Sequence, residues 1–86
     1  GALIRVKLSV VPRLGRVLLE SPMGDDQIVS CGDDEDDDWI VEATVPEAEK
    51  FVWWLLSLGA GVAVRAPLEL RERVASELRC ASEYYE

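Results

Sequence analysis

Apolar and polar residues alternate along residues 3–11, a pattern typical of a β-strand with one buried face. The apolar residues of the alternation are Leu3, Ile4, Val6, Leu8 and Val10. The polar residues between them are Arg5, Lys7 and Ser9. Pro12 ends the strand and suits the first turn of a helix, so residues 12–20 are expected to form a short amphipathic helix. Gly15 is expected to weaken that helix by roughly 1 kcal/mol relative to alanine.

Two more strands are predicted at residues 27–31 and 39–45, joined only by a polar connection. Such neighbours most simply form an antiparallel hairpin. The connection is longer than a usual hairpin loop, which favours a flexible tip with nothing packed on it. In the second of these strands, Glu42 and Thr44 are expected to point away from the core.

Residues 44–47 (Thr-Val-Pro-Glu) match a capping box, and the helix that follows is expected to end at Gly59. Its apolar residues wrap too far around the helix to be covered by one sheet face, and Trp53 is the residue left over. Two interpretations of Trp53 remain open. It packs in the core beneath the last helix, or it contacts a neighbouring domain or a second protomer, because tryptophan is enriched at interface hot spots.

A fourth strand is predicted at residues 61–66 and a last helix at residues 67–85. The apolar stripe of that helix is Leu70, Val74, Leu78, Ala81 and Tyr85. At about 28 Å, a helix of this length would cross the whole body of so small a domain. The element order predicts an α+β fold of the ferredoxin-like βαββαβ type, with a four-stranded antiparallel sheet in the order 4-1-3-2 and an extra C-terminal helix. The first two helices would cover one face of that sheet.

The acidic residues are concentrated in one segment of the chain. Residues 1–86 are expected to form a single domain of net charge −8, and residues 25–38 hold eight of the 17 acidic residues and no basic one. The spacing of an EF-hand is not met there, so a solvated connection is favoured over weak binding of a divalent ion. No apolar run is long enough for a membrane span and no signal peptide is recognised, so a cytoplasmic protein without membrane contact is expected.

The side chains that most catalytic and metal sites require are missing. The chain has no histidine, which excludes Ser-His-Asp and Cys-His catalysis and leaves a transition-metal site short of ligands. Neither an enzyme activity nor a metal or other cofactor is therefore expected. Cys31 and Cys80 are expected to pack in the core of a reduced protein rather than to form a redox pair.

Three basic residues are expected to meet on the sheet face that the first two helices leave open. Arg5 and Lys7 point to it from the first strand and Arg65 from the fourth, and these strands are neighbours in the predicted order. Two interpretations stay open: cross-strand ion pairs on a solvated sheet, or a site for an anionic effector or a nucleic-acid phosphate backbone. Sequence-specific RNA recognition is not expected, because this face offers at most one aromatic ring.

Three runs in the second half of the chain resemble a known family. They are Trp54-Leu-Leu-Ser-Leu-Gly59, Val62-Ala-Val64 and Pro67-Leu-Glu-Leu-Arg71-Glu-Arg-Val74. Together they resemble the WCX domain, the C-terminal extension of bacterial WYL-domain transcriptional regulators, over nearly the whole chain. The resemblance implies a fragment of a longer regulator, without the winged helix-turn-helix and WYL domains, that does not bind operator DNA by itself.

The resemblance further implies a non-enzymatic module that senses an effector, supports dimerisation, or both, and so controls DNA binding by the absent N-terminal domain. It would contact the regulator's own WYL and helix-turn-helix domains, and in some members of the family the effector is single-stranded DNA. A single-stranded nucleic acid or a nucleotide is thus a candidate ligand, and its expected contacts are Arg5, Lys7 and Arg65. The expected interface residues of a homodimer are Trp53, Trp54 and Tyr85. The alternative is a purely structural dimerisation domain with no ligand.

Overall fold

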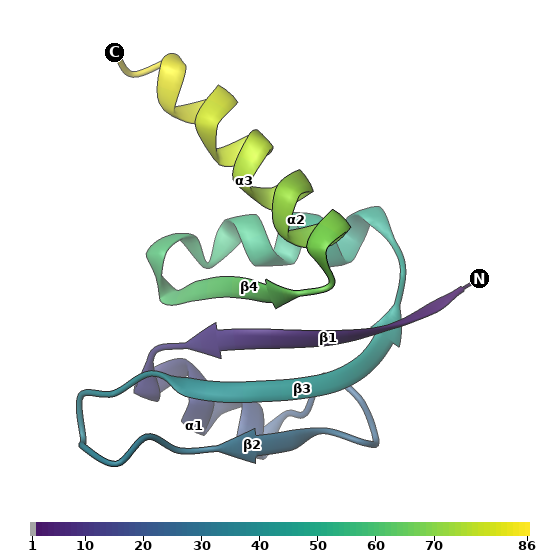
Figure 1. Cartoon of the computed structure of the whole chain (residues 1–86), viewed down its shortest axis with the longest axis vertical. Coiled ribbons are helices and arrows are strands. Elements are labelled where there is room, and N and C mark those ends of the chain that lie inside the picture. Colours follow the sequence, from purple (N-terminus) through teal and green to yellow (C-terminus); the bar gives the residue numbers. More distant parts are fainter. Residues whose placement is uncertain (1) are drawn as a thin grey trace.

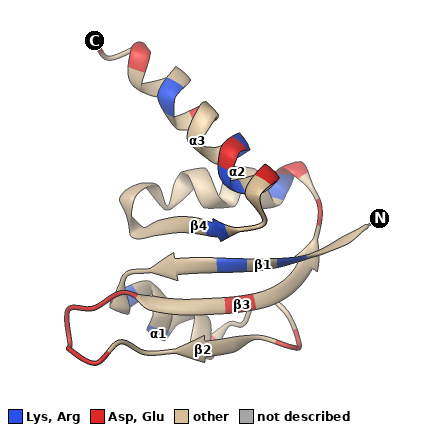
Figure 2. Cartoon of the chain, viewed as in Figure 1, with Lys and Arg blue, Asp and Glu red and all other residues tan. Residues whose placement is uncertain are grey.

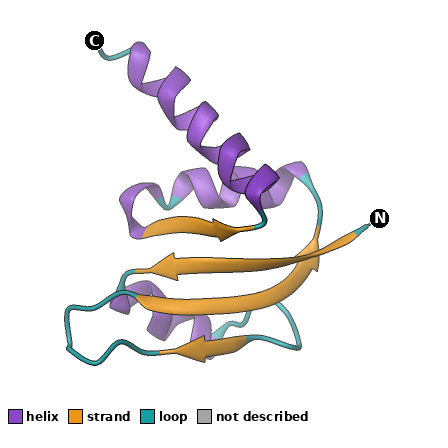
Figure 3. Ribbon diagram, viewed as in Figure 1, coloured by secondary structure: helices purple, strands orange, loops and turns teal. Residues whose placement is uncertain are grey.

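The computed structural model describes residues 2–86 as a twisted four-stranded antiparallel sheet with helices packed on one face (Figure 1). Its elements are β1 (Leu3–Val10), α1 (Pro12–Glu20), β2 (Ile28–Ser30), β3 (Trp39–Pro46), α2 (Glu49–Ser57), a 3-10 turn (Gly59–Gly61), β4 (Val62–Ala66) and α3 (Leu68–Glu83). The strand order β2-β3-β1-β4 confirms the predicted ferredoxin-like arrangement with an added C-terminal helix (Figure 3). Within residues 2–86, no helix combines the length and the apolar character that crossing a membrane requires.

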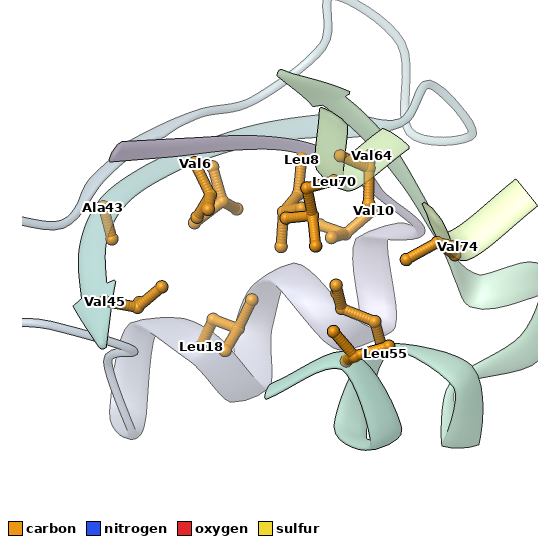
Figure 4. Packing of buried hydrophobic residues seen from close by; sticks show 12 residues of the cluster. Val6, Leu8, Val10, Leu18, Ala43, Val45, Leu55, Val64, Leu70 and Val74 are labelled. Atoms are coloured by element: carbon orange, nitrogen blue, oxygen red, sulfur yellow. The ribbon is translucent and has the colours of Figure 1, made fainter. Parts of the chain in front are cut away.

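The core lies between the sheet and the helices α1 and α2. β1 occupies the middle of the sheet and pairs with β3 on one side and with β4 on the other. Figure 4 shows the inward-pointing side chains of these strands meeting those of the helices. The buried apolar residues are Val6, Leu8, Val10, Leu18, Val41, Ala43, Val45, Val52, Leu55, Val64, Leu70 and Val74.

One end of β1 departs from the expected alternation. Leu3 was expected on the buried face, but 67% of it is exposed, whereas Ile4 packs against the core. The strict two-residue period of a strand explains the difference, because Leu3 has the same parity as the outward-pointing Arg5 and Lys7. The polar Ser9 also lies on the outer face, but it is buried.

α1 approaches the sheet more closely than its sequence implies. A β-carbon added at Gly15 would lie 2.6 Å from Cδ2 of Trp39, the first residue of β3. The guanidinium of Arg16 lies 5.8 Å from the centre of the same indole ring. The glycine that weakens the helix in isolation is therefore what allows α1 to pack against this ring.

The start of α2 differs from the prediction. The capping box at residues 44–47 is wrong, because β3 continues through Pro46 and the residue before the helix, Ala48, has no side-chain cap. The Thr44 hydroxyl instead donates a hydrogen bond to the carboxylate of Asp26. The predicted end of the helix is confirmed: Gly59 has a φ of +54°, which glycine adopts without strain.

α3 leaves the body of the domain instead of crossing it (Figure 1). Its first half is held by Leu70 and Val74 in the core, and by Arg71, whose Nη1 donates to the carbonyl of Val64 at 2.8 Å. The second half is exposed, including Leu78 and Tyr85 from the predicted apolar stripe. The stripe is real, but the sheet and α2 end before they can cover all of it.

Candidate functional site

The three basic residues singled out in the sequence lie on the neighbouring strands β1 and β4, where basic positions are coloured in Figure 2. Each alternates with the buried residues of its strand, so all three point to the open face of the sheet. Each has acidic groups close by. Arg5 Nη1 donates to Asp26 Oδ2 at 2.7 Å, and Lys7 lies directly opposite Glu42 in the β1–β3 register. Arg65 lines a shallow hollow together with acidic residues of the connection between β2 and β3. The face is thus a mixed-charge surface, on which an anion would meet carboxylates as well as cations.

Asp26 is the organising residue of this face, although it belongs to an acidic segment that was expected to be solvated. Its carboxylate accepts hydrogen bonds from the Thr44 hydroxyl at 2.6 Å, from the Thr44 backbone N–H at 2.9 Å and from Arg5. The Thr44 hydroxyl is the largest cause of a lowered pKa at Asp26, followed by the Thr44 backbone N–H, and the charge of Arg5 lowers it further. This residue therefore ties the segment before β2 to the outer face of β3.

Replacing Asp26 with asparagine is expected to remove a pH-dependent part of the stability. Because the pKa of Asp26 is lower in the folded than in the unfolded chain, its carboxylate stabilises the fold above the ordinary pKa of 3.8. That contribution is lost as the pH falls through the lowered folded value. The gap in unfolding free energy between the wild type and Asp26→Asn should therefore be constant near neutral pH and should shrink below about pH 4.

Urea unfolding at a series of pH values measures this gap, and Asp25→Asn is the matched control because it removes a neighbouring carboxylate that forms none of these bonds. The control should leave the pH profile close to that of the wild type. A gap for Asp26→Asn that stayed constant into strong acid would contradict the prediction.

The acidic connection of residues 33–38 is exposed. It was expected to make no contacts, but two of its side chains form hydrogen bonds. Asp37 Oδ2 accepts from the Asp34 N–H at 3.1 Å, and the buried Ser9 donates to Asp38 Oδ2 at 3.2 Å. Among residues 2–86, no three acidic or sulfur side chains are grouped as metal ligands would be. The connection is a solvated turn whose base rests on β1.

The two cysteines do not lie in the core, so that prediction is wrong. Cys31 follows β2 and Cys80 lies in the projecting half of α3, and both are exposed free thiols. β2 ends at Ser30, before Cys31, and the last buried residue of α3 is Val74, before Cys80. The sequence suggested burial only from the general behaviour of free cysteine, which is a weak guide to any single position.

The expected interface residues separate into two groups. Trp53 is 68% exposed on α2 and Tyr85 is 92% exposed beyond the end of α3, so the interpretation of Trp53 as a core residue is wrong. Trp54 turns to the other side of α2, where it is half-buried and stacks on Phe51 with ring centroids 5.6 Å apart. Trp53 and Tyr85 thus offer free apolar surface, whereas Trp54 does not share it.

An ion pair marks the seam between α2 and α3. Arg73 of α3 donates two hydrogen bonds to the carboxylate of Glu49 on α2, at 2.9 and 2.8 Å. One helical turn further along each helix lie Trp53 on α2 and Glu77–Leu78 on α3. The two helices diverge from this contact (Figure 1), and Trp53 on α2 and Leu78 on α3 are both exposed.

Comparison with known proteins agrees with this architecture. A family model described as the WCX domain matches residues 2–82. A search of curated proteins returned no significant match to the chain. The matched residues include the entire sheet, α1 and α2, and almost all of α3. Since the match covers nearly the whole chain, the protein belongs to the WCX domain family.

Proposed function

We propose that this WCX domain is the C-terminal contact module of a WYL-type transcriptional regulator, and that it joins two protomers through α3 and Trp53. The observation that supports the proposal is the apolar stripe of α3, which continues beyond the body of the domain and is left exposed by the rest of residues 2–86. In the longer regulator, contact between protomers at this surface would set the spacing of the attached DNA-binding domains.

A partner would stabilise the exposed half of α3 more than it would stabilise an ordinary surface helix, which already packs on its own domain. A few helical turns without tertiary contacts are marginally stable in water, because their stability in proteins comes mainly from packing. A second helix laid along Leu78, Ala81 and Tyr85 would supply that packing. Ala81 and the neighbouring Ser82 are small, which permits close approach of the partner's backbone.

A second copy of the chain fits this surface because Trp53 of α2 and the outer half of the α3 stripe are both exposed. In a two-fold dimer the same patch serves both partners, so each protomer would cover the other's exposed stripe. Trp53 would then lie beside the partner's α3, in the position where buried tryptophan contributes most to binding. The bidentate Arg73–Glu49 pair joins the two helices beside this surface, which favours a preformed arrangement.

Replacing Leu78 with glutamate is expected to weaken self-association of the 86-residue protein at least about tenfold, because a charge would have to be buried at the interface. Sedimentation over a range of protein concentrations measures the effect, and Trp53→Ala should act in the same direction. Leu19→Glu is the control, since Leu19 is an exposed leucine on α1, outside this seam. Equal self-association of all variants, or a wild type that stays monomeric, would contradict the proposal.

Effector binding on the open face of the sheet is the second candidate function, supported by the exposed cations of Lys7 and Arg65 on adjacent strands. A short single-stranded DNA added to the same sedimentation samples distinguishes the two. Binding that is lost in Lys7→Glu and Arg65→Glu, but kept in Leu78→Glu, would establish an effector face independent of the dimer. The pairing of Arg5 with Asp26 makes protomer contact the better-supported function.

A further inference from the structure

A cleft of about 440 Å³ lies between α1 and α2, on the opposite side of the sheet from the basic residues. α1 and α2 both pack on this face of the sheet, but they make few contacts with each other. Leu18 and Val45 form its buried floor (Figure 4), while Met23, Phe51 and Trp54 line it further out. Both the volume and the largely apolar lining are in the range of sites that bind small organic molecules.

The side chain of Gln27 helps to hold the wall of the cleft beyond α1 in place. Gln27 Nε2 donates to the Leu18 carbonyl at 2.8 Å, near the end of α1, and its Oε1 accepts from the Met23 N–H at 2.9 Å. The same segment is anchored to β3, because Asp26 binds the backbone and hydroxyl of Thr44. These bonds keep Met23 away from α2, so the cleft is preformed and a ligand does not have to open it.

The cleft carries one charge, and it is positive. Lys50 is the only ionisable residue that lines it, and among residues 2–86 Lys50 forms no ion pair. Its acidic neighbours Glu47 and Glu49 face a different hollow, next to α3, where Glu49 is bound to Arg73. An occupant therefore meets apolar walls, two aromatic rings and one basic residue, the exposed Lys50.

We propose that this cleft binds a small amphipathic carboxylate, with an aromatic or aliphatic body against Met23, Phe51 and Trp54 and its anionic end at Lys50. The apolar body gains from leaving water, and the carboxylate stays at the exposed rim, where it remains partly hydrated beside the cation. A cation would be repelled by Lys50, and a highly charged anion such as a polyphosphate would find a single partner in apolar surroundings. The site is separate from the open sheet face and from α3, and it does not depend on the proposed dimer.

The test is a titration of the 86-residue protein with 2-naphthoate, followed by NMR. For a ligand of this size a dissociation constant on the order of 1 mM is expected. The indole N–H signal of Trp54 and the amide signals of Met23 and Phe51 should shift, whereas the indole N–H of the exposed Trp53 should not. Shifts that spare Trp54, or none at ligand concentrations well above this value, would overturn the proposal.

Lys50→Gln separates the two parts of the site. It should weaken binding of 2-naphthoate about three- to fivefold, the usual size of a partly exposed charge contact, and leave binding of the neutral 2-naphthylmethanol unchanged. Lys7→Gln, which removes a cation on the other side of the sheet, is the matched control and should change neither. Ala48→Trp should block the cleft to both compounds. Equal affinities of Lys50→Gln and the wild type for 2-naphthoate would overturn the assignment of the anionic end.

Discussion

Replacing Leu8 with alanine is expected to lower the free energy of unfolding by about 3–5 kcal/mol. Leu8 lies at the centre of β1, is completely buried, and is paired with Val41 on one side and with Val64 on the other. With strands on both sides and helices below, the surroundings cannot collapse to fill the space that the side chain leaves. Since a domain of this size has a total stability of only about 4–13 kcal/mol, the variant should be close to unfolding.

Urea denaturation followed by circular dichroism measures this loss. Leu3→Ala is the control, since Leu3 lies on the same strand with 67% of its surface exposed, and it should cost less than about 1 kcal/mol. Similar losses for the two variants would contradict the assignment of the inner and outer faces of β1.

Replacing Gly15 with alanine is expected to destabilise the protein by about 2 kcal/mol, although alanine is the better helix former. The new methyl group would lie 2.6 Å from Cδ2 of Trp39, so either α1 or the indole ring must move. The ring is wide, and it is held between α1 and the start of β3. The cost of overpacking should therefore exceed the gain of roughly 1 kcal/mol in helix propensity.

Two further variants establish whether the contact with Trp39 is the cause. Gly61→Ala should change stability by less than about 0.5 kcal/mol, because its β-carbon would lie 3.7 Å from the nearest atom, a methyl group of Val11. In a Trp39→Leu background, Gly15→Ala should become neutral or stabilising, which thermal unfolding of the double variant would show. A loss that persisted without the indole ring would mean that the backbone at Gly15, rather than Trp39, limits the substitution.

Features that depend on neighbouring residues in the chain could be predicted from the sequence. The alternation in β1 identified Val6, Leu8 and Val10 as inward residues because side chains of a strand point to opposite faces in turn. Gly59 marked the end of α2 because few other residues accept its left-handed backbone. The order of the elements was enough for the strand order, since right-handed crossovers leave few arrangements.

The candidate surfaces were predicted less well, because they depend on how far neighbouring elements reach. Trp53 could have been covered by the last helix. It is exposed because α3 turns away from α2 beyond the contact between Arg73 and Glu49. The placement of Arg5 on the open face was predictable from its parity. Its partner Asp26 was not, because the two residues are 21 positions apart and meet through an irregular segment.

The sequence by itself determined the order of the elements, the inward faces of β1, β3 and β4 apart from Leu3, and the resemblance to the WCX family, because all three follow from local periods and short motifs. Only the tertiary structure decided which part of the apolar stripe of α3 is exposed. The same holds for the bonds of Asp26 to Arg5 and Thr44, and for the cleft that α1 and α2 leave beside Lys50. These features arise from the angles and distances between packed elements. Such angles are set by contacts between residues far apart in the chain, such as Gly15 against Trp39, that no local pattern contains.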